Sequence, residues 1–146
     1  KPDGLQRGLV GEIIHRFERK GLKLVAIKMI KLDDPILDDW YAHHKDKPFF
    51  QNLKDYMKSS PVVGMLWEGV EAVSAVRKLT GQTLAREAEM GSIRGDFAMS
   101  QQYNLIHASE TSQVAQKEEK LIFDPAEIFD YPRTVEPHIY TEEELE

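Results

Sequence analysis

The spacing of apolar residues predicts a helix followed by a strand in the first thirty residues. Across residues 8–20 the apolar side chains recur at helical spacing, and Gly21 follows at the position of a C-cap glycine. Residues 22–30 are apolar on both faces, which favours a strand in the centre of a sheet. The apolar helix positions are Leu9, Val10, Ile13, Ile14 and Phe17.

Two helices are predicted between this strand and the next. Asp34 is a good N-cap and Pro35 suits the first turn, so a helix should begin there. Residues 47–50 interrupt the pattern, and a shorter helix should follow as far as Ser59. The apolar or aromatic positions are Ile36, Leu37, Trp40, Tyr41 and His44 in the first helix, and Leu53, Tyr56 and Met57 in the second.

The second half of the chain predicts two more strands and two more helices. We expect strands at residues 62–68 and 104–107, and helices from Ala72 to a cap at Gly81 and over residues 112–123. Residues 82–92 have no clear period and predict a long surface loop, a type that is usually functional or disordered. An Arg-Gly-Asp turn at residues 93–97 should follow it.

This order of elements favours an α+β fold, in which helices pack on an antiparallel sheet. Residues 1–4 have the composition of a turn, and three strands are few, so we expect a further strand upstream of Lys1 that this sequence lacks. The length suits one domain over residues 1–146, with residues 124–146 as a C-terminal extension.

Composition narrows the possible functions. The net charge of -6 argues against nucleic-acid binding, but much of the acidity lies in residues 142–146, so a positively charged cleft elsewhere is compatible with it. The absence of cysteine excludes disulfides, thiol nucleophiles and cysteine-ligated metals. No apolar run reaches the length of a membrane span, and no signal peptide opens the sequence, so we expect a cytoplasmic protein.

The strongest chemical candidate is His107, at the end of the apolar run 104–107. Imidazole can act as a nucleophile near neutral pH, and Arg94 and Asn104 lie close to it in sequence. The guanidinium of arginine suits phosphate recognition. A lone histidine after an apolar run is nevertheless more often structural, and on these residues alone that alternative stays open.

Five segments together resemble the nucleoside diphosphate kinase family. They are residues 1–4, 47–50, 64–69, 93–97 and 104–109, and the likeness runs without a gap from Lys1 to about Phe123. The resemblance implies a ferredoxin-like βαββαβ core whose first strand would precede Lys1. It also implies a ping-pong reaction, in which a nucleoside triphosphate phosphorylates His107 and the phosphoryl group then passes to a nucleoside diphosphate.

The resemblance assigns a supporting role to two residues near His107. Glu118 matches the glutamate that orients the catalytic imidazole, and its place among the apolar positions of its helix fits that role. An ordinary surface glutamate is the alternative. Ser109 matches a serine beside the histidine, although a plain turn residue is nearly as good an interpretation.

The remaining site residues are likewise implied by the resemblance. Basic and hydroxyl groups would bind the phosphates, an amide and an amine would bind the sugar, and the base would lie between two apolar side chains. Stacking of that kind reads no base edge, which fits a broad nucleotide range. Mg²⁺ would arrive with the nucleotide, and the sequence shows no dedicated metal cluster. The residues are Lys1, Arg77, Arg94, Thr83 and Tyr41 for phosphate, His44 as a weaker candidate, Asn104 and Lys1 for the sugar, and Phe49 and Leu53 for the base.

Some residues depart from the family pattern. Leu84-Ala85 follow Thr83 where Asn-Pro is common, in a region that supports subunit contacts, and Ala108 and Glu110 replace a usual glycine and aspartate. The resemblance still implies a homo-oligomer, with a hexamer favoured and the tail over residues 128–140 on a neighbouring subunit.

Two alternatives to the kinase remain open. One is a non-catalytic nucleotide-binding or protein-interaction member of the same fold, which would be expected to lack the histidine or several phosphate-binding residues; here all are present. The other is a protein that passes phosphate from the same histidine to a protein substrate.

Overall fold

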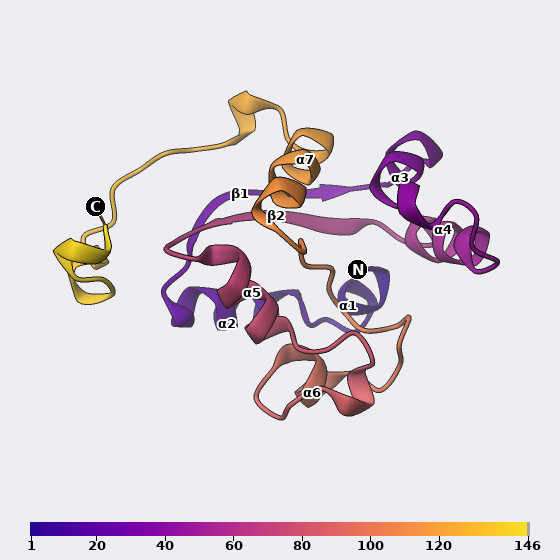
Figure 1. The fold of residues 1–146 in the computed structure, drawn as a ribbon, viewed down its shortest axis with the longest axis horizontal. Coiled ribbons are helices and arrows are strands. Elements are labelled where there is room, and N and C mark those ends of the chain that lie inside the picture. Colours follow the sequence, from indigo (N-terminus) through magenta and orange to yellow (C-terminus); the bar gives the residue numbers. More distant parts are fainter. Residues whose placement is uncertain (146) are drawn as a thin grey trace.

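Two antiparallel strands form the centre of the fold (Figure 1). The computed structural model describes residues 1–145 of the chain. Strand β1 (Lys23–Ile30) pairs with β2 (Val62–Glu68), so that Lys23 lies opposite Glu68 and Ile30 opposite Val62, with an irregularity between Leu24 and Ala26. Both strands lie within one residue of their predicted positions.

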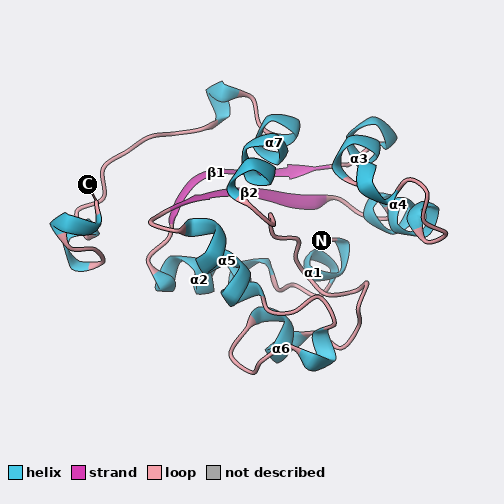
Figure 2. Ribbon diagram, in the orientation of Figure 1, coloured by secondary structure: helices cyan, strands magenta, loops and turns pink. Residues whose placement is uncertain are grey.

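Seven α-helices surround these strands in residues 1–145, as the colouring of Figure 2 shows. In that view α2 and α5 lie below the strands, α7 lies above them, and α3 and α4 sit beyond one end. The helices are α1 (Pro2–Gln6), α2 (Val10–Lys20), α3 (Asp34–Trp40), α4 (Phe50–Lys58), α5 (Ala72–Thr80), α6 (Ile93–Phe97) and α7 (Ser112–Ile122). None of these helices is both long enough and apolar enough to cross a bilayer.

The longer helices confirm the predictions made from apolar spacing. Helix α2 starts two residues later than expected and ends at Gly21, whose φ of 105° is the left-handed conformation that glycine adopts without strain. Helix α3 is capped one residue earlier than expected, because the carboxylate of Asp33 accepts the hydrogen bond from Ile36 N.

Two segments predicted as turns are short helices. Residues 1–4 enter α1, where Pro2 occupies the first helical position and supplies a suitable φ. Residues 93–97 form α6, whose first turn is capped by the hydroxyl of Ser92, which accepts a bond from Gly95 N.

The strand predicted at residues 104–107 is not formed. Leu105 has a φ of 74°, outside the extended region. Its N–H donates to the carboxylate of Asp3 and its carbonyl accepts from the amino terminus of Lys1, each about a hydrogen-bond length away at 3.0 and 2.9 Å. Groups that are distant in sequence thus satisfy the backbone at Leu105.

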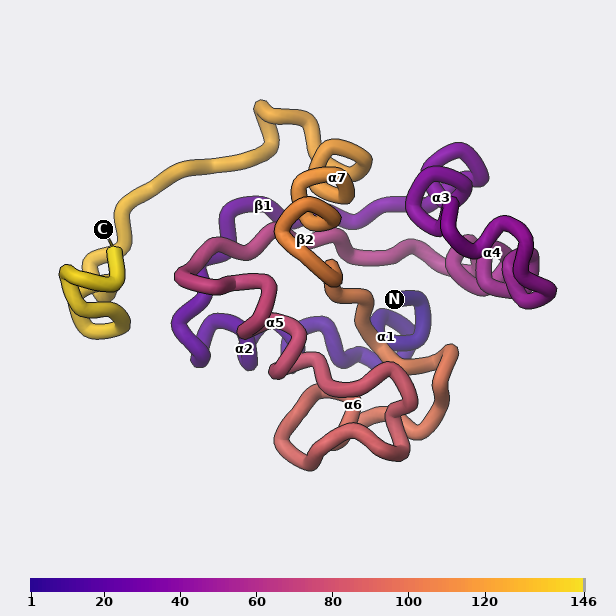
Figure 3. Tube along the Cα trace, in the orientation of Figure 1, coloured from indigo at the N-terminus to yellow at the C-terminus, as the bar shows by residue number. Residues whose placement is uncertain are grey.

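Strand β1 is also not central within the described sheet, since it pairs only with β2. Its other edge is covered in part by the C-terminal tail, which arches away from α7 and returns towards the start of β1 (Figure 3). Phe129 N donates to Val25 O, and the hydroxyl of Tyr131 donates to Leu24 O at 2.7 Å. Ile27 and Met29 of β1 remain exposed.

The core has two parts, and their meeting point positions the functional residues. One part joins α2, α5 and α6 to Leu105 and Ile106, and the other joins α3 and α4 to the start of β2. Residues 104–109 leave the first part and run to α7, beside the end of α3. His107 therefore stands where the two halves of the core adjoin.

Candidate active site

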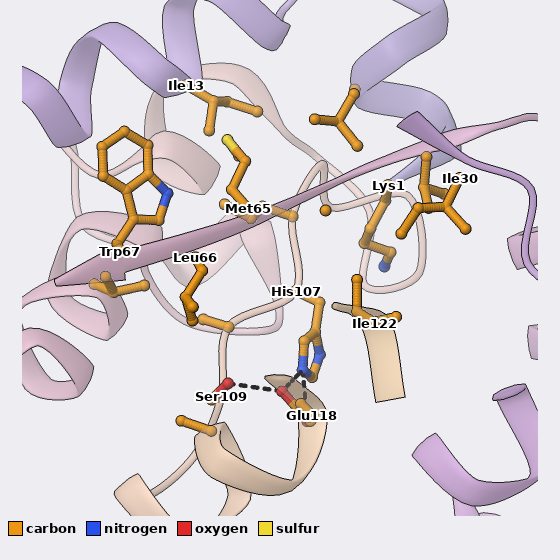
Figure 4. A pocket seen from close by; sticks show the side chains of 18 of the residues that line it. Lys1, Ile13, Ile30, Met65, Leu66, Trp67, His107, Ser109, Glu118 and Ile122 are labelled. Carbon is orange, nitrogen blue, oxygen red and sulfur yellow. Dashed lines mark hydrogen bonds and ion pairs between the residues drawn. The ribbon is translucent and has the colours of Figure 1, made fainter. Parts of the chain in front are cut away.

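His107 lines two hollows. The first, of about 210 Å³, is apolar and lies against β2, with side chains such as Met65 and Trp67 in its wall (Figure 4). The second, of about 1200 Å³, is lined by polar and basic groups together with a few aromatic ones. Only the second has both the volume and the charge to take a nucleotide.

A carboxylate holds one nitrogen of the His107 imidazole. Helix α7 presents Glu118, whose Oε1 and Oε2 each lie 3.0 Å from His107 Nε2, and the hydroxyl of Ser109 donates to Oε2 at 2.6 Å (Figure 4). An ionised carboxylate only accepts hydrogen bonds, so this bond requires the proton on Nε2. Nδ1 then keeps its lone pair and is the nitrogen available for attack.

Glu118 is ionised in this arrangement. Its partial burial acts to raise its pKa, but hydrogen bonds from His107, Ser109 and Trp40 and the attraction of His107 outweigh this effect. The pKa of Glu118 therefore lies below its ordinary value of 4.5. The side chain is 13% exposed, against 33% for His107, so the carboxylate is covered while the imidazole stays accessible.

The end of α3 supplies an aromatic wall to the site. Trp40 Nε1 lies 3.2 Å from His107 Nε2, and the two rings meet edge to face with centroids 5.2 Å apart. Tyr41 follows it, and burial raises the pKa of its phenol to about 12, so the hydroxyl keeps its proton. The sequence predicted Tyr41 as a site residue but assigned Trp40 only to the apolar face of its helix.

Three residues predicted to bind nucleotide also hold the backbone before His107. The buried guanidinium of Arg94 donates to Gly81 O, Asn104 O and Ile106 O at 2.9, 3.2 and 2.5 Å. The Asn104 amide donates to Thr83 O and Gln101 O, and its oxygen accepts from Lys1 Nζ at 2.7 Å. This network fixes the segment that carries the imidazole.

The other predicted residues line the same polar hollow. Arg77 is exposed on α5 and its guanidinium lies 3.5 Å from Ala108 O, beside His107. Phe49 is 47% exposed and its ring meets that of His44 at a centroid distance of 5.2 Å. The residues predicted for catalysis and binding, the weaker candidate His44 included, all line this hollow: Lys1, Tyr41, His44, Phe49, Leu53, Arg77, Thr83, Arg94, Asn104, His107 and Glu118.

The sequence analysis missed further charged residues of this hollow, among them Arg86 and Lys117. Arg86 lies in the loop 82–92, where its guanidinium donates to Met99 O at 3.1 Å. Its only sequence signal was a positive charge in a loop without periodicity, which does not distinguish a site residue from a solvated one.

A salt-bridge cluster joins α3 to α4 on one side of the hollow. Lys54 Nζ lies 2.6 Å from Asp38 and 3.0 Å from Asp34, and these carboxylates raise the pKa of Lys54. Helix α4 carries Leu53, and Phe49 precedes its first residue. The cluster thus sets the position of both candidate base-binding side chains.

Within residues 1–145 no group of three or more histidine, aspartate or glutamate side chains is arranged to hold a metal ion. The site itself consists of an imidazole paired with a carboxylate, facing a hollow with several basic groups.

Comparison with known proteins identifies the family. The family model described as nucleoside diphosphate kinase matches residues 1–128. The chain belongs to the nucleoside diphosphate kinase family. The enzyme of that name from Parabacteroides distasonis is 53% identical over 131 residues, which cover 90% of this chain and 86% of the relative. Nucleoside diphosphate kinase A of Rattus norvegicus is 46% identical over 96% of this chain and 92% of the relative.

Solved nucleoside diphosphate kinases have the same fold. The halophilic enzyme from Halobacterium salinarum, in complex with CDP, superimposes with a TM-score of 0.93 at 44% identity, over 96% of this chain and 93% of that one. A family member from Babesia bovis superimposes with a TM-score of 0.93 at 45% identity, over 96% and 95%. These likenesses confirm the resemblance and the α+β fold predicted from the sequence. The chain is accordingly an enzyme, a kinase that acts on nucleotides.

Proposed function

We propose that this nucleoside diphosphate kinase works by a ping-pong mechanism through a phosphohistidine on His107. The observation that carries the proposal is the bond from Nε2 to Glu118, 3.0 Å long, at the wall of a basic hollow of about 1200 Å³. It leaves Nδ1 with a lone pair beside the space where phosphate would bind. Division of one exchange into two phosphoryl transfers is the usual benefit of such a nucleophile.

In the first step the lone pair of Nδ1 attacks the γ-phosphorus of a nucleoside triphosphate. The Nδ1–P bond forms, the bond from γ-phosphorus to the bridging oxygen breaks, and its electron pair stays on the nucleoside diphosphate that leaves. Nε2 keeps its proton, so the ring becomes a cation that faces the Glu118 carboxylate at 3.0 Å. The second step is the reverse, with a terminal phosphate oxygen of another nucleoside diphosphate as the attacking group.

Charge at the transferring phosphate would be met by the basic groups of the hollow. Phosphoryl transfer depends chiefly on positioning and electrostatics, and Arg77, Arg94 and Lys1 line the space beside His107. Thr83 and Tyr41 would add hydroxyl donors, and Asn104 with Lys1 would bind the sugar. Mg²⁺ would enter with the nucleotide and would supply positive charge to its phosphates.

The base would lie between Phe49 and Leu53 at the outer end of the hollow. The exposed face of Phe49 is free to stack on any base, which fits a reaction that accepts several nucleotides. The CDP bound to the Halobacterium salinarum relative supports a nucleotide ligand of this class.

Initial rates measured with two different nucleotides would test this mechanism. With Mg-ATP varied at several fixed concentrations of a nucleoside diphosphate, double-reciprocal plots should be parallel, because the first product leaves before the second substrate binds. Lines that intersect would show a ternary complex and contradict the proposal. His107→Gln keeps a polar side chain of similar reach and should lose the activity.

We also propose that the chain forms a homo-oligomer, with a hexamer favoured. Exposed apolar side chains on β1 and the tail, among them Ile27, Met29 and Phe129, support a surface that associates. Light scattering should give a mass of about six chains. A monomer mass across the concentration range would contradict this part of the proposal.

A further inference from the structure

Two side chains meet at one nitrogen of His107, and the mechanism proposed above uses only one of them, Glu118. Nε2 lies 3.0 Å from both oxygens of Glu118 and 3.2 Å from the indole nitrogen of Trp40. Glu118 can only accept hydrogen bonds while it is ionised, and the indole N–H can only donate. The imidazole nitrogen therefore has a donor on one side and an acceptor on the other.

Nε2 cannot satisfy both neighbours at once. When it carries a proton it donates to Glu118, and the indole N–H then turns to the carboxylate, which also accepts from Ser109. When Nε2 lacks a proton its lone pair accepts the indole N–H instead. Trp40 thus has a partner in either protonation state, and the two partners lie within one hydrogen-bond length of each other.

The indole also limits how the imidazole can turn. The rings of Trp40 and His107 are close to perpendicular, at 81°, and Trp40 in turn stacks on Tyr41 with centroids 6.4 Å apart. Trp40 is half-buried at the last residue of α3, whose N-terminal part is tied to α4 through Lys54. The indole beside the imidazole therefore belongs to a helix whose position is held by its salt bridge to α4.

We propose that Trp40 is a positioning residue for His107, whose indole N–H bonds to Glu118 in the free enzyme and to Nε2 of the neutral phosphohistidine. This inference rests on the phosphohistidine mechanism and deepens it. Nothing in that mechanism requires a tryptophan, and the role follows from the distances of Trp40 Nε1 and of the Glu118 oxygens from His107 Nε2.

The bond to Nε2 affects how long the phosphoryl group stays on the enzyme. After attack by Nδ1, the cationic ring can release its Nε2 proton to water while Glu118 stays ionised, which leaves a neutral phosphorylated ring with a lone pair on Nε2. The indole N–H stabilises that lone pair and so lowers the tendency of the ring to take a proton back. Protonation of Nε2 makes the imidazole a better leaving group, so the indole slows spontaneous loss of phosphate to water.

Other charged or titratable groups line the same hollow and must be held constant in a test. They are Glu118 from α7, Tyr41 after α3, Arg77 from α5 and Lys1 at the start of α1. The test therefore changes Trp40 alone. Trp40→Phe keeps an aromatic wall and removes the N–H, while Trp40→Gln removes the wall and keeps an N–H donor at similar reach.

The second tryptophan of the chain provides the matched control. Trp67 lies on β2, packs edge to face on Phe17 at a centroid distance of 5.2 Å, and lines only the apolar hollow. Its indole nitrogen is buried without a partner in the part of the chain that the structure describes. Trp67→Phe thus makes the same chemical change away from the nitrogen Nε2 of His107.

The experiment follows decay of the phosphoenzyme isolated after reaction with Mg-ATP, together with the pH profile of kcat/KM. Trp40→Phe should shorten the half-life roughly fivefold, the effect of one hydrogen bond, and should leave the KM for nucleotide within about twofold of the wild type. The acid limb of its profile should move to higher pH, since Glu118 loses a donor. Trp40→Gln should restore the half-life, and Trp67→Phe should behave as the wild type.

A half-life and an acid limb in Trp40→Phe equal to those of Trp67→Phe would overturn the role of the indole N–H. So would a Trp40→Gln enzyme with a half-life as short as that of Trp40→Phe, because the wall rather than the donor would then be the cause. Failure of the wild-type enzyme to form any phosphohistidine would instead reject the mechanism on which the inference depends.

Discussion

Arg94 donates a hydrogen bond of 2.5 Å from its guanidinium to the carbonyl oxygen of Ile106, the residue directly before His107. The same guanidinium binds the carbonyl oxygens of Gly81 and Asn104. Burial lowers the pKa of Arg94 to about 10, so the side chain stays charged at neutral pH. An arginine expected to bind phosphate is therefore also a support for the segment that carries the candidate nucleophile.

Arg94→Lys should destabilise the protein and slow the reaction. An ammonium group cannot reach three carbonyl oxygens in the fixed directions of a guanidinium, so at least one buried carbonyl loses its partner, at a cost of about 1–3 kcal/mol. Urea denaturation should show that loss, and kcat should fall because residues 104–107 shift. Arg86→Lys changes an exposed arginine of the same hollow and is the control; it should unfold at the same urea concentration as the wild type. A variant at Arg94 with unchanged stability would reject the supporting role.

Ser109→Ala should move the acid limb of the activity profile to higher pH. The hydroxyl of Ser109 donates to Glu118 Oε2 and helps to hold the pKa of Glu118 below its ordinary value. Without that donor the pKa of Glu118 rises, so the carboxylate takes up a proton at a higher pH. The measurement is kcat/KM between about pH 4 and pH 8. Ser112→Ala, at an exposed serine, should leave the limb unchanged.

The ionised form of Glu118 also contributes to the stability of the fold. Because the folded pKa of Glu118 is depressed, its contribution is present above the ordinary value of 4.5 and is lost as the pH falls through the folded value. Ser109→Ala removes part of this contribution. The thermal stability of the variant should therefore lie furthest below that of the wild type above pH 4.5, and closest to it in strong acid.

Nucleotide affinity should weaken as the pH rises through about 8. Burial lowers the pKa of the Lys1 side chain to about 8, so the ammonium that faces the hollow is charged below this value and neutral above it. Calorimetric titration with ADP should show the change, and Lys1→Arg should flatten it because a guanidinium keeps its charge. Lys117→Arg changes another lysine of the same hollow and should keep the pH dependence. A flat profile for the wild type would exclude Lys1 from phosphate binding.

Phe49→Ala should raise the KM for purine nucleotides more than it lowers kcat. Loss of a stacked aromatic ring costs about 1–3 kcal/mol of binding, and that interaction lies far from the phosphorus that reacts. Phe129→Ala removes another exposed phenylalanine, from the tail, and serves as the control. Equal KM values for the two variants would show that Phe49 does not touch the base.

The sequence was sufficient where a segment is long enough to show its own period. Helix α2 has one apolar face over three turns and a glycine at its end, and both signals are local. Helices α1 and α6 have five residues each, too few for a period to appear, and their turn-forming residues pointed to the wrong structure. Their helical form depends on caps and on contacts with distant parts of the chain.

The prediction of a strand at residues 104–107 was wrong for a different reason. The apolar character of the segment correctly indicated that it is buried, but not its conformation. Its hydrogen-bond partners are Lys1, Asp3 and Arg94, which no local pattern reveals. The role of Trp40 in the site was likewise not predictable from local sequence. An apolar helix position can face the core or the wall of a hollow, and only the tertiary structure placed its indole beside His107.

The most direct test of the central claim is the intact mass of the protein after incubation with Mg-ATP and after a chase with GDP. The mechanism predicts an acid-labile adduct of one phosphoryl group, which GDP removes and which His107→Ala does not form. Nucleotide binding without an adduct, or an adduct that persists in His107→Ala, would contradict it.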